Sequence, residues 1–364
     1  MSEWTVMHGF GRMRRQRGVS LIELMVAMVL GLLLTAGVLQ IFSSNNQAYR
    51  FHDALSRIQE NGRFALDELT REIRMAGYLG CSSQATSINN WLAGPPADFD
   101  PRIGIQGWEA NGTEPGKTLT IDYSATPVST SGGSWTTNGG APLPTFNARS
   151  GSDIVRIWRG DENIARIVSV DSDSFRITAN HDFAAQDLLM LSDCRTADWV
   201  QACSVTPDGT ETEIGVDTGC ALGNDPSLEI SSSPGGEVSR IMGNIYYVSR
   251  ESADAPPALF RSRLTSTAEA GAGEPLVEGV ENLQVLFGVD TNGDRRIDEH
   301  VTADAVADWR SVVAVRVSLL LVSTENNIVD EPQPVFFNGV LQTPTDRRLR
   351  QVMTTTIALR NRMP

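Results

Sequence analysis

A short acidic stretch in the last third of the chain carries the residues best suited to hold a metal ion. Its oxygen donors are Asp290, Asn292, Asp294 and Asp298. Donors at alternate positions are typical of loops that wrap calcium. Arg295 stands where such loops place glycine, and Val301 stands where they place a bidentate glutamate. The sequence therefore leaves two interpretations open: a calcium site, or a hairpin turn that uses the same residues without metal. No other cofactor is expected.

Residues suited to catalysis do not gather along the sequence. The four histidines are His8, His52, His181 and His300. The sequence has no G-x-S-x-G, H-E-x-x-H or phosphate-cradling G-x-x-x-x-G-K-[ST] motif, so the common arrangements for nucleophilic, zinc and nucleotide chemistry are missing. We therefore expect a protein that is not an enzyme.

A single carboxylate, Glu23, lies at the start of the most apolar segment of the chain. The nineteen residues from Leu24 to Phe42 include only two polar ones, and a helix of that length crosses a hydrocarbon core of about 30 Å. A carboxylate in such surroundings is costly and needs a partner. Four arginines precede the segment, so the positive-inside rule predicts a cytoplasmic N-terminus. A cleavable secretory signal is disfavoured because polar residues, and not a small-residue cleavage site, follow the segment.

The residues around Glu23 resemble the class III signal of type IV pilins and type II secretion pseudopilins. The stretch that begins at Gly18 reads GVSLIELMVAM. The resemblance implies that a prepilin peptidase cuts between Gly18 and Val19, and that the new amine of Val19 is methylated. It also implies that Glu23 pairs with the amine of a neighbouring subunit. Val19 is a mild departure, because the family often has phenylalanine there. Residues 1–18 are then a leader peptide, and residues 19–42 a transmembrane and filament-core helix.

The helix is expected to continue over residues 43–80 as an amphipathic segment. No proline occurs before Pro95, and apolar residues recur at steps of three and four, which predicts one apolar helix face. These apolar residues are Phe51, Leu55, Ile58, Ala65, Leu66, Leu69, Ile73 and Ala76. The charged residues, Glu72 among them, are expected largely on the other faces. Gly77 and Gly80 are candidate stop signals.

Residues 81–364 are expected to form a mostly β globular head. Strands are predicted at 118–123, 154–158, 164–170, 174–178, 188–191, 241–249, 259–264, 280–289, 312–322 and 352–359. Residues 81–152 and 193–237 are rich in turn-forming residues and predict a loop-rich insertion. The expected fold class is α+β, with a long N-terminal helix, transmembrane in its first half, packed on an antiparallel sheet.

Composition excludes two classes of protein. The chain has 30 Lys and Arg residues against 44 Asp and Glu residues, a formal charge of −14, so a nucleic-acid binder with a basic face is not expected. An apolar fraction of 41% suffices for a packed core, so wholesale disorder is excluded.

The C-terminal third resembles the PilW family of type IV pilus minor pilins. The similar stretches are residues 276–294, 309–321 and 347–362, together with residues 57–81. The resemblance implies a filament subunit that primes pilus assembly, sits at the pilus tip, and supports twitching motility and adhesion. It implies other minor and major pilins, the prepilin peptidase, the inner-membrane assembly machinery and a PilY-type tip adhesin as partners. The chain would cross the inner membrane once, with its head in the periplasm, and then enter the pilus at the cell surface.

Three alternatives remain at this point, and one of them is a calcium-dependent adhesin module, which is compatible with a tip location. A minor pseudopilin of the type II secretion system, of the GspJ class, shares the general plan. A membrane-anchored periplasmic hydrolase belongs to another class, and would need a convergent catalytic cluster in the head.

The four cysteines are expected to form disulfides, because a head across the membrane lies in the oxidising periplasm. They are Cys81, Cys194, Cys203 and Cys220. One pairing joins Cys81 to Cys194 and closes a loop between Cys203 and Cys220. Pairing Cys194 with Cys203, and Cys81 with Cys220, is nearly as plausible.

Overall fold

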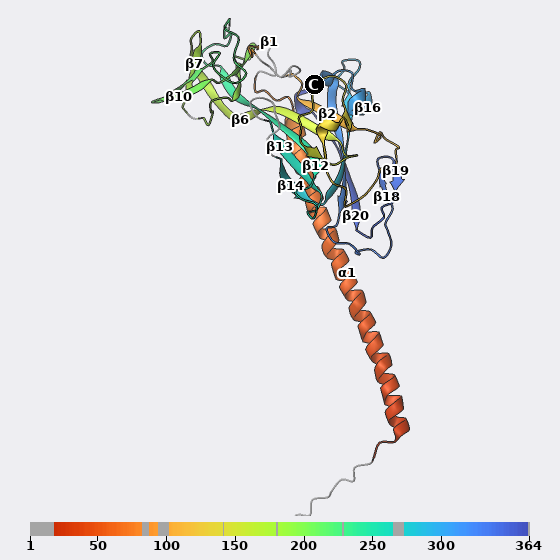
Figure 1. Ribbon diagram of the computed structural model, residues 1–364. Coiled ribbons are helices and arrows are strands. Elements are labelled where there is room, and N and C mark those ends of the chain that lie inside the picture. The colour runs from red at the N-terminus through yellow and green to blue at the C-terminus, as the bar shows by residue number, and fades with distance from the viewer. Residues whose placement is uncertain are drawn as a thin grey trace, which may run out of the picture. The chain divides into compact units, whose positions relative to one another are not determined.

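A computed structural model describes residues 18–81, 87–93, 102–140, 142–179, 181–227, 229–264 and 273–362 (Figure 1). The chain divides into two units, Met1–His52 and Asp53–Pro364. The predicted leader before Gly18, with its arginines, lies outside the described residues.

The first unit is the N-terminal part of helix α1 (Leu21–Met75). Leucine, alanine and methionine, which favour helices, dominate its sequence up to Phe42. The helix is long and apolar enough to cross a membrane, and none of its most apolar window is buried against the protein. This segment therefore presents an apolar surface that the described chain leaves uncovered.

The second unit begins with the rest of α1, whose buried face packs on the head. The buried residues are Ala54, Ile58, Gly62, Ala65, Leu69, Glu72 and Ile73. The predicted face is confirmed in register, but the expectation that Glu72 lies off it is wrong, because Glu72 is buried. The helix ends at Met75, and Gly77 then takes a left-handed φ of +70°, as expected of a glycine that stops a helix.

A four-stranded antiparallel sheet receives this helix face. Its order is β16 (Glu299–Val301), β15 (Val280–Val289), β17 (Val312–Val322) and β20 (Arg350–Ala358). A Cβ at Gly62 would meet the side chains of Leu321 and Met353, so the glycine lets α1 approach the sheet closely. The hairpin of β18 (Val335–Phe337) and β19 (Val340–Gln342) contributes to an apolar cluster with Leu320 of β17.

A larger sheet is built on two long antiparallel strands, β6 (Ile154–Val170) and β12 (Glu237–Ser249). One half of this pair carries β2 (Ile105–Ala110), β4 (Trp135–Thr136), β13 (Ala258–Arg263) and β14 (Glu274–Glu278). The other half carries β7 (Ser174–Thr178), β8 (Leu188–Ser192), β9 (Thr196–Gln201), β10 (Ser204–Asp208), β11 (Glu211–Gly215) and β1 (Ser87–Asn90). The second set forms a lobe at one end of the head (Figure 1). A separate short pair joins β3 (Val128–Ser129) to β5 (Asn147–Ala148).

The α+β class is confirmed, and several strands have the predicted bounds. Strands 174–178, 280–289 and 312–322 are confirmed to the residue. The predicted strands 154–158 and 164–170 are one continuous strand, β6. The strand predicted at 118–123 is wrong: Leu119 and Ile121 are buried, but the N–H of Leu119 bonds to the side chain of Gln342 in β19 and not to the backbone of a neighbouring strand. The predicted irregular region 193–237 contains β9, β10 and β11.

Candidate assembly site

The predicted processing and assembly residues lie together at the start of α1. Gly18, Val19 and Ser20 precede the helix, and all three are exposed. Glu23 is in the first turn of α1, and the Ser20 N–H lies 3.4 Å from Glu23 Oε2. An acidic side chain in a first turn also faces the positive end of the helix dipole. The structure thus places a carboxylate within one turn of the point where the resemblance implies a new amino end.

The surface around this carboxylate is apolar on every side of the helix. Large apolar side chains from Val19 to Phe42 are about half to three-quarters exposed, for example Leu21 at 77% and Phe42 at 65%. Gly31 and Gly37 have open space where a Cβ would stand. In lipid or in a bundle of similar helices, such small positions permit close helix contact.

Two carboxylates on α1 fix the helix to the head. Glu72 is 2% exposed; its Oε1 lies 3.2 Å from Arg159 Nη2, and Asn244 Nδ2 lies 3.0 Å from its Oε2. Glu68, one turn earlier, has its Oε1 3.2 Å from Arg261 Nη1. A buried carboxylate with both a cation and a neutral donor is satisfied, so Glu72 locks the register of α1 against β6 and β12.

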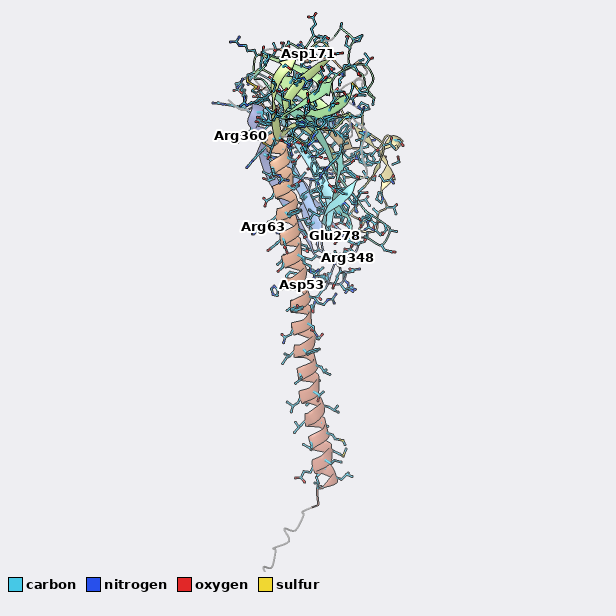
Figure 2. The ribbon with its side chains drawn as sticks, turned by 90° about the vertical axis from the view of Figure 1, so that its left-hand side faces the viewer. Asp53, Arg63, Asp171, Glu278, Arg348 and Arg360 are labelled. Carbon is cyan, nitrogen blue, oxygen red and sulfur yellow. A yellow bond between two sulfur atoms is a disulfide. The ribbon has the colours of Figure 1, made fainter. Side chains whose placement is uncertain are left out.

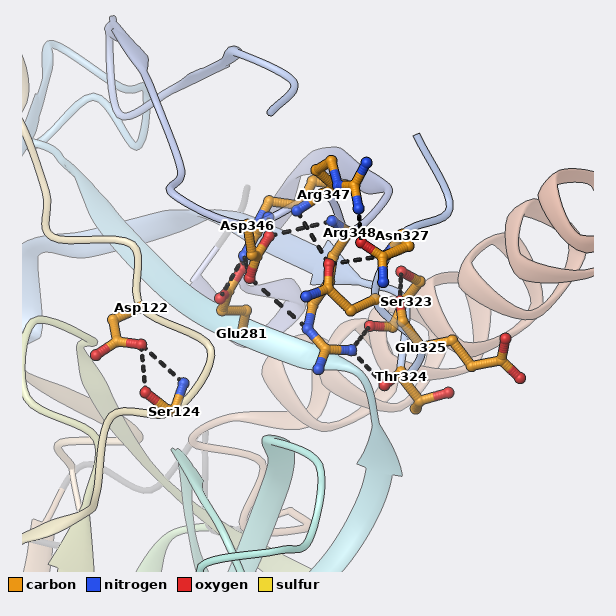
Figure 3. A network of polar contacts seen from close by, with 12 residues as sticks. Asp122, Ser124, Glu281, Ser323, Thr324, Glu325, Asn327, Asp346, Arg347 and Arg348 are labelled. Carbon is orange, nitrogen blue, oxygen red and sulfur yellow. Dashed lines mark hydrogen bonds and ion pairs between the residues drawn. The ribbon is translucent and has the colours of Figure 1, made fainter. Parts of the chain in front are cut away.

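A second polar network holds the beginning of β20 (Figure 3). The Arg350 side chain is fully buried, with its Nε 2.7 Å from Glu281 Oε2 and its Nη2 3.0 Å from Asp346 Oδ2. Arg348 donates to the carbonyls of Ser323 and Thr324, beyond the end of β17. Bidentate arginine–carboxylate pairs are geometrically specific, so this network anchors β20 to β15 and β17.

The cysteines form the first of the two predicted pairings. Cys81 is bonded to Cys194, with Cα atoms 4.8 Å apart, and Cys203 to Cys220, with Cα atoms 4.7 Å apart. The first disulfide joins the segment after α1 to the turn between β8 and β9. The second closes a loop within the lobe, so each disulfide has a different structural task.

The acidic loop forms the turn between β15 and β16. Asp290 accepts the backbone N–H groups of Asn292, Gly293 and Arg295, at 2.7–3.1 Å. Asp298 accepts the N–H and hydroxyl of Thr291. Arg295 takes the left-handed conformation, with φ +62°. Within the described ranges no three His, Cys, Asp or Glu side chains are placed to hold a metal ion. Calcium binding stays a prediction, and calorimetry of the protein with calcium tests it.

Sequence reasoning missed a pair of buried carboxyls beside a cavity of about 290 Å³. Burial raises the pKa of Glu109 to about 9, and the nearby Asp153 adds to the shift. Burial also raises the pKa of Asp153 to about 7, although the N–H groups of Ala110 and Val285 oppose the shift. Among the described residues, Glu109 Oε2 has no hydrogen-bond partner. No motif could have revealed the pair, because β2 and β6 bring it together from positions far apart in sequence.

A larger cavity, of about 570 Å³, lies between the last turns of α1 and strands β6, β12 and β13. Its charged lining is largely paired: Arg159 with Glu72, and Arg240 with Asp182 and Asp187. In the described part of the head, neither cavity is lined by histidine or cysteine. The predicted dispersal of the described histidines agrees with this: His52 is on α1, His181 follows β7 and His300 is in β16.

Two family models match the chain. Residues 13–39 match the prokaryotic N-terminal methylation motif, which places the start of the chain among prepilin-type subunits. Residues 245–361, from within β12 to beyond β20, match PilW, the type IV pilus-assembly protein W. A search of curated proteins finds none that matches the chain.

These matches confirm the resemblance predicted from the sequence. Together with the membrane-type helix and the β head, they support a type IV pilus-related minor pilin. The C-terminal third of the chain, residues 245–361, is similar to the PilW family. Both matches point to a structural protein and not to an enzyme.

Proposed function

We propose that this protein is a minor pilin that primes assembly of a type IV pilus and sits at the pilus tip. The single observation that carries the proposal is the position of Glu23, one turn from Val19 on a helix whose apolar surface is uncovered. The methylation-motif and PilW matches support it. The PilW match favours a pilus over a secretion pseudopilus.

Assembly begins with cleavage between Gly18 and Val19. Both residues precede the helix and are exposed, so the bond is open to a prepilin peptidase. Before assembly the helix spans the inner membrane, with the N-terminus in the cytoplasm and the head in the periplasm. Its apolar surface then exchanges lipid contacts for contacts with the helices of neighbouring pilins.

Glu23 selects the correct depth of each subunit in the helix bundle. A carboxylate in hydrocarbon is unfavourable unless it is paired. The amino end at residue 19 of a neighbouring subunit supplies a cation at the required height. Pairing of these two groups favours one axial stagger over all others, and the small residues Gly31 and Gly37 permit close packing below it.

The head carries the functions exerted outside the cell. Twitching motility and adhesion, through other minor and major pilins, the inner-membrane assembly machinery and a PilY-type tip adhesin, are the roles we propose for it. Its two disulfides and its arginine–carboxylate pairs support a subunit that keeps its shape in the extracellular medium.

Glu23→Ala tests the proposal in cells that carry the pilus system. We expect the variant to insert in the membrane at the wild-type level but to be at least about tenfold depleted from sheared pili, because the buried partner of the amino end is lost. Gln40→Ala, a polar change on the same exposed helix, is the matched control and should assemble normally. Wild-type levels of Glu23→Ala in sheared pili would refute the assembly role.

A further inference from the structure

Strand β20 is an edge strand, and the backbone groups on one of its sides are not paired with a described strand. It is the last strand of the four-stranded sheet and pairs only with β17. The Leu359 N–H bonds to the Val313 carbonyl, and the Ser323 N–H bonds to the Leu349 carbonyl. Because antiparallel pairs bond at every second residue, the odd-numbered residues of β20 bond to β17. The backbone groups of the even-numbered residues point outward.

These outward groups are accessible and unpaired. In the described part of the chain, no hydrogen bond reaches the backbone N–H or C=O of Thr354, Thr356 or Ala358. All three residues are exposed. The arginine network around Arg350 fixes the start of the strand, so the edge is held in an extended shape before any partner arrives.

The other edge strands carry devices that block pairing, and β20 does not. β1 and β16 have only four and three residues. β14 and β10 contain Pro275 and Pro207 as well as acidic residues. Residues 351–358 of β20 read QVMTTTIA, with no charge and no proline. Proteins use short strands, prolines and charges to prevent sheet edges from pairing with other chains. Because residues 351–358 of β20 lack these devices, this edge can accept another strand.

A second copy of this chain does not fit the edge. Gly62 of α1 lies beside Met353, and Asn361 Nδ2 is 3.2 Å from the Ala76 carbonyl, so β20 runs in the same direction as the head-bound part of α1. The labelled Arg348 and Arg360 show this direction along the helix (Figure 2). Antiparallel pairing of two copies would set their α1 helices in opposite directions, which two subunits anchored in one membrane cannot adopt.

Parallel pairing of two copies also fails. Two β20 edges can meet in parallel only after a half-turn of one copy about the strand direction. Because α1 packs on one face of the sheet, beside Leu321 and Met353, this half-turn would set the two α1 helices on opposite faces of the joined sheet, where they could not pack against each other in one helix bundle. The occupant is therefore a different polypeptide.

We propose that β20 accepts an extended strand from a neighbouring, non-identical pilin subunit, which continues the sheet beyond Thr354–Ala358. The inference rests on the proposed function, because it takes a pilin as the partner. Backbone hydrogen bonds supply the binding in such strand addition, and alternate side chains supply the choice of partner. The valine, isoleucine and threonine residues of β20 favour extended structure and contacts with side chains of an added strand.

A photo-crosslinking side chain placed at Thr354, Thr356 or Ala358 of the full chain tests the strand directly in cells. We expect adducts with another pilin, and we expect the attachment points to move stepwise along one extended segment as the probe moves along β20. The same probe at Thr206, on the protected edge strand β10, is the control and should not give this adduct. Adducts to a second copy of this chain, to a helix or to scattered positions overturn the proposal.

Thr356→Pro is the matching functional variant. It removes one outward N–H but leaves the bonds to β17, since proline is tolerated at an edge. We expect an unchanged melting temperature and about tenfold less variant in sheared pili, because the added strand loses its bonding partner. Thr356→Val, which keeps the N–H, should behave as wild type.

The outcomes separate the two proposals. If folded Thr356→Pro enters pili at the wild-type level, strand addition is overturned. If the variant is destabilised, the adduct map decides. If the wild-type protein itself is missing from sheared pili, the minor-pilin function fails, whatever the edge strand binds.

Discussion

Glu72, Glu109 and Glu23 are three carboxylates that the chain accommodates in different ways. Glu72 is buried between Arg159 and Asn244, which satisfy its charge. Glu109 is buried without a cation, and its raised pKa keeps it neutral. Glu23 lies on an exposed apolar helix, and in the described residues its one hydrogen-bond donor is the Ser20 N–H. We therefore expect the charged partner of Glu23 to come from another molecule.

Glu109→Gln tests the buried neutral carboxyl through the pH dependence of unfolding. The pKa of Glu109 is raised from 4.5 to about 9 in the folded state. Ionisation therefore favours unfolding, and stability held at low pH is lost between pH 4.5 and about 9. Glutamine cannot ionise. We therefore expect the free energy of unfolding of the variant to rise relative to that of the wild type as pH rises, by on the order of 3 kcal/mol at about pH 8.

Thermal unfolding of both proteins between acid and weakly alkaline pH measures this difference. Asp153 remains in the variant with its own raised pKa, so some loss of stability with pH is expected there as well. Parallel pH profiles for the two proteins would show that Glu109 is not buried in its neutral form.

Glu72→Ala tests the ion pair between α1 and the head. Removal of the carboxylate leaves Arg159, 14% exposed, without its counter-charge, and such a loss costs about 3 kcal/mol. Asp53→Ala is the matched control on the same helix. It breaks an exposed pair with Arg57, for which we expect a change of about 0.5 kcal/mol or less. Urea unfolding measures both, and equal effects would contradict a buried pair.

At the scale of elements, the sequence predicts what depends on local pattern. The strand 312–322 is a nearly continuous apolar run, and the strand 280–289 interleaves apolar and polar residues; both are confirmed to the residue. Helical spacing predicts the buried face of α1 except at Glu72. A charged residue is expected on the exposed face of a helix unless a buried partner for it is known. Arg159 lies 87 residues away in sequence, so no local pattern could have shown that partner.

In the lobe, the local sequence pattern does not predict all of the strands. Strands β9, β10 and β11 lie among turn-forming residues that conceal their apolar alternation. Val200 of β9 and Ile214 of β11 are buried in a cluster shared with β6, β7 and β8, and the partly buried Val205 of β10 packs against it. Only the tertiary fold assembles this cluster. For the same reason, the cavity beside Glu109 could not be predicted, whereas Gly18, Val19 and Glu23 form a contiguous motif and could.

The two disulfides are expected to contribute unequally to stability. Their sequence separations are 113 and 17 residues. In the chain-entropy model, loss of the longer loop costs about 5 kcal/mol and loss of the shorter about 3 kcal/mol. Denaturant unfolding of Cys81→Ser/Cys194→Ser and Cys203→Ser/Cys220→Ser measures the order, and peptide mapping under non-reducing conditions checks the pairing. A larger loss from the short loop would argue against this division of tasks.

At the scale of the whole molecule, two units with different surfaces make one subunit. The segment before Asp53 exposes apolar side chains, and the unit from Asp53 onward buries its own in several clusters. A water-soluble protein does not leave an apolar surface like that of the segment before Asp53 exposed to water. The net charge of −14 suits a head that remains in water and does not bind nucleic acid through a basic face.

In the proposed assembly, Glu23 on its apolar helix meets the amino end of another subunit. Mass spectrometry of the protein recovered from pili measures where that amino end is. We expect a chain that begins at Val19 and carries one methyl group on its amine. A mature chain that still contains the first eighteen residues, or that starts at any other position, would contradict the proposed assembly.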